Sequence, residues 1–288
     1  MRLFLLTALT MTAFAANSVL NRMAVGHYGM PPESFAIVRA LSGAIVLWAL
    51  VAARGRKLPL ADWSGRLIGA GALSLYLVGF SLAYGRLDAG IGALILFGGV
   101  QLTMFGGALI GGEAIPVRRW IGAAVSLAGL AYLVWPRGAA DTPGPEIGFM
   151  AAAALGWGIY SLKGRGAKDP LALTAANFVI SVPIVALLLF VAPFETTPAG
   201  AALAIFSGAV TSGLGYALWY AILPSLGATR AAVAQLSAPV IAALGGALFL
   251  SEPVGARLII ASVLVLGGSG VSLVHQRYRS DLTSLCAK

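Results

Sequence analysis

The chain has 288 residues, of which 59% are hydrophobic and only 10% are charged, and its mean hydropathy is +0.91. This composition lies outside the range of soluble globular domains and predicts a membrane protein. The net charge of +9 does not indicate nucleic-acid binding, because the basic residues are spread over predicted loops and form no single basic face. The single cysteine, Cys286, excludes an intrachain disulfide and offers no basis for redox chemistry.

Ten apolar stretches are each long enough for a helix that crosses the hydrocarbon core, which takes about 20 residues. They are, in chain order, residues 3–21, 34–53, 67–85, 90–111, 118–136, 147–163, 171–192, 199–222, 228–250 and 254–275. Short connections join them, and little of the chain remains for a soluble domain. The sequence therefore predicts an all-α polytopic protein with ten transmembrane helices, passing several times through the inner (plasma) membrane.

Prolines stand at or just before most of the predicted helix starts, where the missing N–H costs no hydrogen bond. The examples are Pro32, Pro116, Pro145, Pro170, Pro198 and Pro253. Pro183 and Pro239 fall inside predicted spans instead, where each is expected to kink its helix. Pro239 and Gly245 are therefore candidates for a hinge in the ninth span.

The first apolar stretch admits two interpretations. Its basic start, apolar centre and Ala13-Phe14-Ala15 are typical of a cleaved signal peptide, whereas its continuation to Arg22 gives the length of an uncleaved span. The loop charges favour the span, since 14 of the 19 Lys and Arg residues lie on the inner side when the N-terminus is cytoplasmic. Both termini, including the tail 281–288, are then predicted to be cytoplasmic.

A shift of 139 residues aligns the chain with itself. GGALIGGEAIPVR at 106–118 falls on GGALFLSEPVGAR at 245–257, so that Glu113 is paired with Glu252. This register predicts two repeats.

Each predicted repeat holds five spans, with residues 1–137 in the first and residues 138–280 in the second. Because five is odd, the second repeat must enter the membrane from the opposite side to the first. Inverted repeats are typical of secondary transporters, in which a central site near the midplane lies between the halves.

The repeats resemble the EamA-type members of the drug/metabolite transporter superfamily. The motif APVIAALGGALFLSEP at 238–253, with Trp157 in the sixth span and Leu-Trp-Tyr at 218–220 in the eighth, is similar to that family's second half. The first half differs, because Val100 stands where the second half has Pro239. The resemblance implies that helices one to four and six to nine surround a central cavity, with helices five and ten outside. It also implies transport, most often export, of small metabolites such as amino acids and their derivatives.

Charged residues near or within the predicted spans are candidates for function, because a charge there costs about 2.5–3.5 kcal/mol on insertion. Arg39 is interpreted either as an anchor for a substrate carboxylate or as a structural arginine that pairs with a carbonyl group. Glu113 and Glu252 each precede a predicted helix, where a carboxylate caps the N-terminus of that helix; the alternative is a gate or proton site.

Uncharged polar and aromatic residues complete the predicted substrate site. Together with Arg39, the candidates are Asn17, Tyr76, Tyr84, Gln101, Trp157, Tyr160, Tyr216, Trp219 and Gln235. Tyr76, Phe80 and Tyr84 recur at i, i+4 and i+8 and so share one helix face. The alternative for such residues is an interfacial aromatic belt or helix packing.

These features predict a secondary transporter that moves zwitterionic or anionic metabolites by alternating access, as facilitated diffusion or exchange. Other cargo, such as drugs or vitamins, and a structural or sensory role stay open. An intramembrane enzyme is disfavoured, because His27 and His275 lie far apart in the sequence and no HExxH spacing exists. We expect no metal and no cofactor. The expected partners are a small-molecule substrate and the lipid bilayer, with a homodimer left open.

Overall fold

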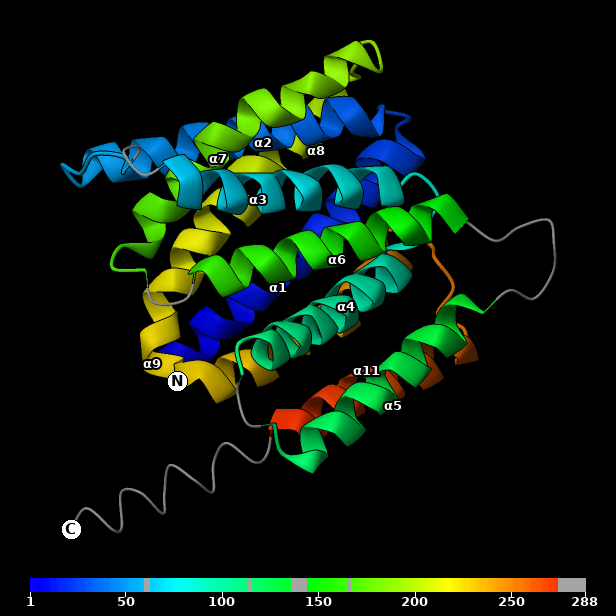
Figure 1. Cartoon of the computed structure of the whole chain (residues 1–288). Helices are drawn as coiled ribbons and strands as arrows, with labels where there is room; N and C mark the ends of the chain where they lie inside the picture. Colours follow the sequence, from blue (N-terminus) through cyan, green and yellow to red (C-terminus); the bar gives the residue numbers. More distant parts are fainter. Residues whose placement is uncertain (60–62, 113–114, 136–143, 165–166, 274–288) are drawn as a thin grey trace, which may run out of the picture.

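The structure of the protein is a computed structural model that describes residues 1–59, 63–112, 115–135, 144–164 and 167–273 (Figure 1). Within these ranges the chain forms helices and turns and contains no β-strand. The helices are α1 (Arg2–Arg22), η1 (Met23–His27), α2 (Pro32–Ala53), α3 (Trp63–Ala83), α4 (Ala89–Ile110), α5 (Val117–Val134), α6 (Gly144–Gly164), α7 (Pro170–Ala186), η2 (Leu187–Phe190), α8 (Pro198–Phe206), η3 (Ser207–Leu214), α9 (Gly215–Gln235), α10 (Ala238–Leu250) and α11 (Ala256–Leu273).

The helices follow the predicted boundaries closely over most of the chain. Pro32, Pro170 and Pro198 each lie in a first helical turn, as predicted. Among the described residues, seven helices are long and apolar enough to cross a membrane, and the apolar helices Ala238–Leu250 and Ala256–Val271 are shorter. The chain is therefore a multi-pass membrane protein, while the count of ten spans stays a prediction.

The predicted division between the eighth and ninth spans is wrong. A single helical run formed by α8, η3 and α9 continues from Pro198 to Gln235, and the break comes only at residues 236–237. Pro239 accordingly lies in the first turn of α10 and not in the middle of a helix. A proline there loses no hydrogen bond, so the chain places its break before this residue. Pro224, by contrast, lies inside α9.

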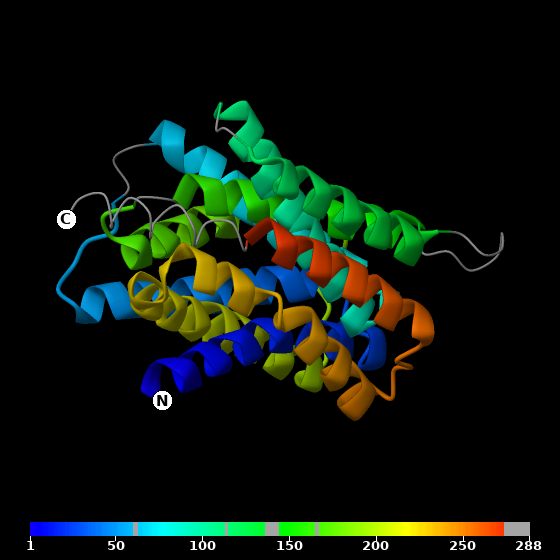
Figure 2. The same cartoon turned by 90° about the horizontal axis from the view of Figure 1, so that it is seen from below.

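Helices of the two predicted repeats pack against each other throughout the bundle. α2 packs on α7, α3 on α6, α4 on α6 and α10, and α1 on η3, α9 and α10. α5 and α11 lie side by side along one side of the bundle, below α4 in Figure 1 and again adjacent in Figure 2. The resemblance implied this outer position for helices five and ten.

The crossing of α5 and α11 joins equivalent positions of the repeat. Ser126 Oγ donates to the carbonyl oxygen of Val265 at 3.1 Å, and these two residues are 139 positions apart. Equivalent left-handed residues also follow the equivalent helices: Gly112 has a φ of 70° after α4 and Ser251 has a φ of 55° after α10. These pairings fit the predicted repeat, whereas its inversion relative to the membrane stays a prediction.

Candidate functional site

Arg39 lies completely buried in the first half of α2. Its Nη2 donates to the hydroxyl oxygen of Tyr76 at 2.9 Å, and its Nε donates to Ser212 Oγ at 3.2 Å. The guanidinium carbon also lies 4.8 Å from the centre of the Phe80 ring, within reach of a cation–π contact. No carboxylate of the described residues forms an ion pair with Arg39, and its Nη1 has no hydrogen-bond partner among them. The site therefore holds a guanidinium with one unused donor group.

Close contact between α2 and η3 brings Arg39 to its partners. Gly208 of η3 makes this contact possible, because a Cβ at that position would collide with the carbonyl oxygen of Arg39 and with Ser42 Oγ. η3 is a π-helical segment, a distortion that is frequent at functional sites. Its extra backbone per turn places Ser207, Thr211 and Ser212 on the side of α1 and α2.

Asn17 of α1 connects these hydroxyl groups. Its Oδ1 accepts hydrogen bonds from Ser207 Oγ at 2.8 Å, from Thr211 Oγ1, and from Ser212 Oγ at 3.4 Å. Since Ser212 also accepts from Arg39, one continuous hydrogen-bonded network joins α1, α2, α3 and η3. We call Arg39, Tyr76, Asn17 and Ser212 the Arg39 site.

An aromatic cluster adjoins the Arg39 site. The ring of Trp157 in α6 lies 4.9 Å from Tyr76, 5.5 Å from Tyr160 and 5.2 Å from Tyr216. Phe14 of α1 packs edge-on against Tyr216 and Trp219 of α9. All predicted aromatic candidates except Tyr84 therefore gather around one place rather than forming a belt.

A second polar cluster continues from the Arg39 site along α1 and α3. Asn21 Nδ2 donates to Ser81 Oγ at 3.3 Å, and the ring of Tyr84 lies 4.8 Å from that of Phe80. Ser18 Oγ and Asn21 Oδ1 are buried and have no hydrogen-bond partner among the described residues. This cluster ends where α1 itself ends, at Arg22.

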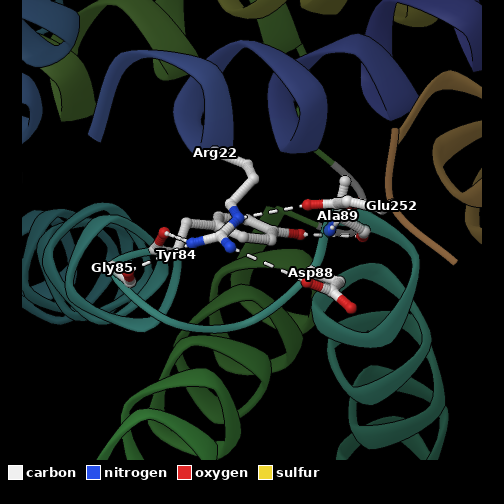
Figure 3. A network of polar contacts seen from close by, with 6 residues as sticks. All are labelled: Arg22, Tyr84, Gly85, Asp88, Ala89 and Glu252. Atoms are coloured by element: carbon white, nitrogen blue, oxygen red, sulfur yellow. Dashed lines mark hydrogen bonds and ion pairs between the residues drawn. The ribbon is translucent and has the colours of Figure 1, made fainter. Parts of the chain in front are cut away.

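Arg22 joins four helices at this end of the bundle, which we call the Arg22 end (Figure 3). Its Nη1 donates to the carbonyl oxygens of Tyr84 and Gly85 after α3, at 3.2 and 3.1 Å. Its Nε donates to Glu252 Oε1 at 3.1 Å, and its Nη2 lies 3.7 Å from Asp88. We call Arg22, Asp88, Glu252 and the N–H of Ala89 the Arg22 network.

Glu252 was predicted to cap the helix that follows it in the sequence. That prediction is wrong, because Glu252 caps a different helix. Glu252 Oε2 accepts from the backbone N–H of Ala89, the first residue of α4, at 2.8 Å. The carboxylate therefore caps a helix of the other repeat. Gly246 allows this, because a Cβ there would collide with Glu252 Oε2. Burial raises the pKa of the Glu252 carboxyl above its usual value, and this outweighs the opposite effects of the Ala89 N–H and of Arg22.

An ion pair also joins the repeats at the opposite end. α2 starts near the Arg22 end and runs away from it, and after its last turn Arg56 Nη1 lies 2.5 Å from Asp169 Oδ2. Asp169 caps α7 by accepting from the N–H of Ala172. Burial alone would raise the pKa of Asp169, but the Ala172 N–H and the Arg56 guanidinium prevail and hold that pKa below its usual value.

The remaining predicted site residues fall outside the Arg39 site. Gln101 and Gln235 are half-buried and take no part in its hydrogen bonds. A Cβ at Gly245 would press on Val19, so this glycine serves the packing of α10 on α1. Glu113 lies outside the described residues, as does the predicted boundary between the repeats at residues 137–138.

Several residues of these networks escaped the sequence analysis. Ser207 and Thr211 are small hydroxyl residues, which are common in membrane helices as packing groups. Arg22 was counted among the loop cations, although its place at the end of an apolar stretch that also carries Asn17 and Asn21 is a signal that could have been used. Within the described residues, no group of three or more His, Cys, Asp or Glu side chains is arranged to hold a metal ion.

Comparison with known proteins supplies independent information. The EamA-like transporter family matches residues 1–135 and again residues 144–274. An uncharacterized protein of Pseudomonas aeruginosa is 44% identical over 281 residues, which cover 97% of both chains. A solved crystal structure with 23% identity matches with a TM-score of 0.69 over 94% of this chain and 98% of that one, so the two share a fold.

Proposed function

Because the chain belongs to the EamA-like transporter family, and so to the drug/metabolite transporter superfamily, we propose that it is a secondary transporter of small carboxylate-bearing metabolites. The cargo would be amino acids and related zwitterionic or anionic compounds, exported across the inner membrane by alternating access. Family membership indicates a small-molecule transporter and not an enzyme, whereas the cargo class is inferred from the site.

Arg39 is the observation that carries this proposal. A guanidinium in the interior of a membrane protein is costly unless an anion or several acceptors compensate it. Tyr76 and Ser212 satisfy two of its nitrogens, both with neutral oxygens, and Nη1 remains without a partner among the described residues. A carboxylate is the ligand that best completes such a group, because it accepts charge-assisted hydrogen bonds from a guanidinium.

The aromatic cluster supports a cargo that also has an apolar or cationic part. Trp157, Tyr160 and Tyr216 present ring faces and edges next to Tyr76, which itself bonds Arg39. Rings of this kind bind apolar groups and can stabilise an ammonium group. The Arg39 site would hold the carboxylate, and the rings would hold the remainder.

The repeat supports alternating access as the mechanism. Since each half packs against the other across the Arg39 site, rocking of one half on the other would expose the site to either side. The charge distribution in the loops supports cytoplasmic termini, which would place the Arg22 end on the outer face.

A counterflow screen in proteoliposomes tests this function. Carboxylates, including amino acids, are compared with their neutral amides as cargo. We expect exchange of at least one carboxylate and, for Arg39→Ala, a loss of roughly 100-fold or more, since a site built for a charged group rejects cargo that it cannot pair. Arg54→Ala, an exposed change after the same helix, is the matched control. Transport of only neutral or cationic cargo, untouched by Arg39→Ala, would refute the proposal.

Trp157→Ala belongs to the same screen. We expect it to weaken exchange by roughly tenfold, because an aromatic ring next to the cargo contributes about 1–2 kcal/mol to binding. Leu155→Ala, an exposed change on the same helix, is the control.

A further inference from the structure

The Arg22 network connects the two predicted repeats. Arg22 and Asp88 come from the first repeat and Glu252 from the second, and the dashed contacts in Figure 3 all meet at the Arg22 guanidinium or at Glu252. The network fastens the ends of α1, α3, α4 and α10 to one another. Two of these helices carry residues of the Arg39 site, since Asn17 lies on α1 and Tyr76 lies on α3. A motion that separates the repeats at this end must therefore break the contacts of Glu252.

The backbone around Glu252 is built to hold the carboxylate in this place. Ser251 adopts a left-handed conformation, with φ 55° and ψ 29°, which is unfavourable for a residue with a side chain. The turn sends the chain back over α10, where the N–H of Glu252 donates to the carbonyl oxygen of Gly246 at 3.2 Å. This left-handed C-cap, closed by backbone hydrogen bonds to Gly246, fixes the point at which the Glu252 side chain leaves the chain.

The pairs at the two ends differ in exposure. The side chains of Arg22 and Glu252 are 22% and 10% exposed, whereas those of Arg56 and Asp169 are 59% and 30% exposed. Exposed pairs contribute little to stability, while breaking a largely buried pair leaves a poorly solvated charge. The Arg22 end is therefore the more firmly closed end of this conformation.

A direct structural route joins this network to the Arg39 site. The carbonyl oxygen of Tyr84 accepts from Arg22, the ring of Tyr84 packs on Phe80, and Phe80 lies under the Arg39 guanidinium. The unpartnered Ser18 Oγ and Asn21 Oδ1 lie on α1 between Asn17 and Arg22. Polar groups thus line the wall between the Arg39 site and the Arg22 end.

We propose that the Arg22 network is a gate, in which Glu252 closes the path from the Arg39 site at the Arg22 end by holding Arg22 and the N-terminus of α4. This inference rests on the proposed function, because a gate requires a transported cargo. It assigns to Glu252 and Arg22 a role in conformational change and not in cargo recognition.

Thiol accessibility tests the gate without any cargo. In a Cys286→Ser background, Ser81→Cys places a reporter between the Arg39 site and the Arg22 end. A membrane-impermeant methanethiosulfonate is added to intact cells or to inside-out vesicles. We expect Glu252→Ala to raise the labelling rate from the Arg22 end by roughly tenfold, because it raises the population of the open state. Glu252→Gln keeps the acceptor oxygen but loses the charge, so its labelling rate should lie between those of the parent and of Glu252→Ala.

Arg56→Ala is the matched control, because it breaks the inter-repeat pair at the opposite end. It should leave labelling from the Arg22 end unchanged or lower it. Equal labelling in Glu252→Ala and the parent would overturn the gate. So would a rise in labelling only from the opposite end.

A reversible disulfide between α4 and α10 tests the gate even if the Glu252→Ala variant does not fold. A Cβ built on Gly246 lies 3.2 Å from Ala89 Cβ. This is slightly shorter than the separation of about 3.5–4.5 Å in a disulfide, so Ala89→Cys with Gly246→Cys should join α4 to α10 after a small shift. The new side chain at position 246 displaces Glu252 Oε2, so the disulfide takes the place of the contact between Glu252 and α4 in this variant. Oxidation should stop counterflow and reduction should restore it. Counterflow that continues in the oxidised protein would contradict the gate. Absence of counterflow in the parent protein would instead count against the proposed function, and the thiol test would still stand.

Discussion

At the scale of residues, polar side chains in apolar stretches were the signal that selected the candidate site residues. Arg39 was predicted as a candidate because a charge is costly in a bilayer, and Asn17 and Tyr76 were predicted as polar and aromatic groups within spans. The structure joins all three in one hydrogen-bonded network. Glu252 was predicted as a cap, but its partners Ala89 and Arg22 lie 163 and 230 positions away in the sequence. Sequence spacing predicts neighbours within one helix and gives no information about partners across the fold.

The pH dependence of stability tests the environment of Glu252. Its pKa is raised by burial, so the folded protein binds this proton more tightly than the unfolded chain does. Stability should therefore rise, relative to Glu252→Gln, as the pH falls through the raised pKa toward about 4.5, the usual value for this carboxyl. Asp88, Arg22 and Tyr84 are the charged or titratable groups that face Glu252.

Thermal unfolding in detergent between pH 7 and pH 5 measures this difference. His27→Gln, an exposed change in η1, is the control. A wild-type protein that loses stability relative to Glu252→Gln as the pH falls would show that the Arg22 pair, and not burial, dominates.

At the scale of elements, the length of the apolar stretches and the placement of prolines located most helices but not their irregularities. The π-helical η3 and the break at residues 236–237 were both missed. The reason is physical: an apolar helix that is packed on many sides shows no change of pattern where its hydrogen bonding changes. Ser207 and Thr211 became recognisable as part of the site only after η3 was seen to present them to Asn17.

Gly208→Ala tests whether the close contact of η3 with α2 supports the Arg39 site. The added methyl group would meet the Arg39 carbonyl, which cannot move without shifting α2. We expect a loss of about 1–3 kcal/mol of stability, the usual cost of overpacking, together with weaker counterflow. Gly71→Ala in α3 is the control, since a Cβ there has open space around it. If both variants unfold at the same temperature, the tight contact is not what holds α2 on η3.

At the scale of the whole molecule, the internal repeat in the sequence was the basis for predicting the fold. The family match covers both predicted halves, and α5 meets α11 at the equivalent residues Ser126 and Val265. The repeat is not exact in its details, however. Gly107 makes room for Leu162, whereas its equivalent Gly246 makes room for Glu252. An alignment of the chain with itself reveals shared architecture, while the side chains that fill it differ between the halves.

This difference between the halves makes the two ends of the bundle unequal. The partly buried Arg22 network stands at one end, and the more exposed Arg56–Asp169 pair stands at the other. A transporter built in this way would rest with the Arg22 end closed and would expose the Arg39 site more readily to the opposite side. Under the predicted topology, that side is the cytoplasm, which suits the loading of an exporter.

We propose above all that the Arg39 guanidinium recognises a carboxylate on the cargo. Its most direct test is the ratio of counterflow rates for one carboxylate and its neutral amide, measured in the wild-type protein and in Arg39→Gln. Glutamine retains hydrogen-bond donors but lacks the charge. We predict a strong preference for the carboxylate in the wild-type protein and a ratio near one in Arg39→Gln. A preference of equal size in both proteins would show that Arg39 does not recognise the carboxylate.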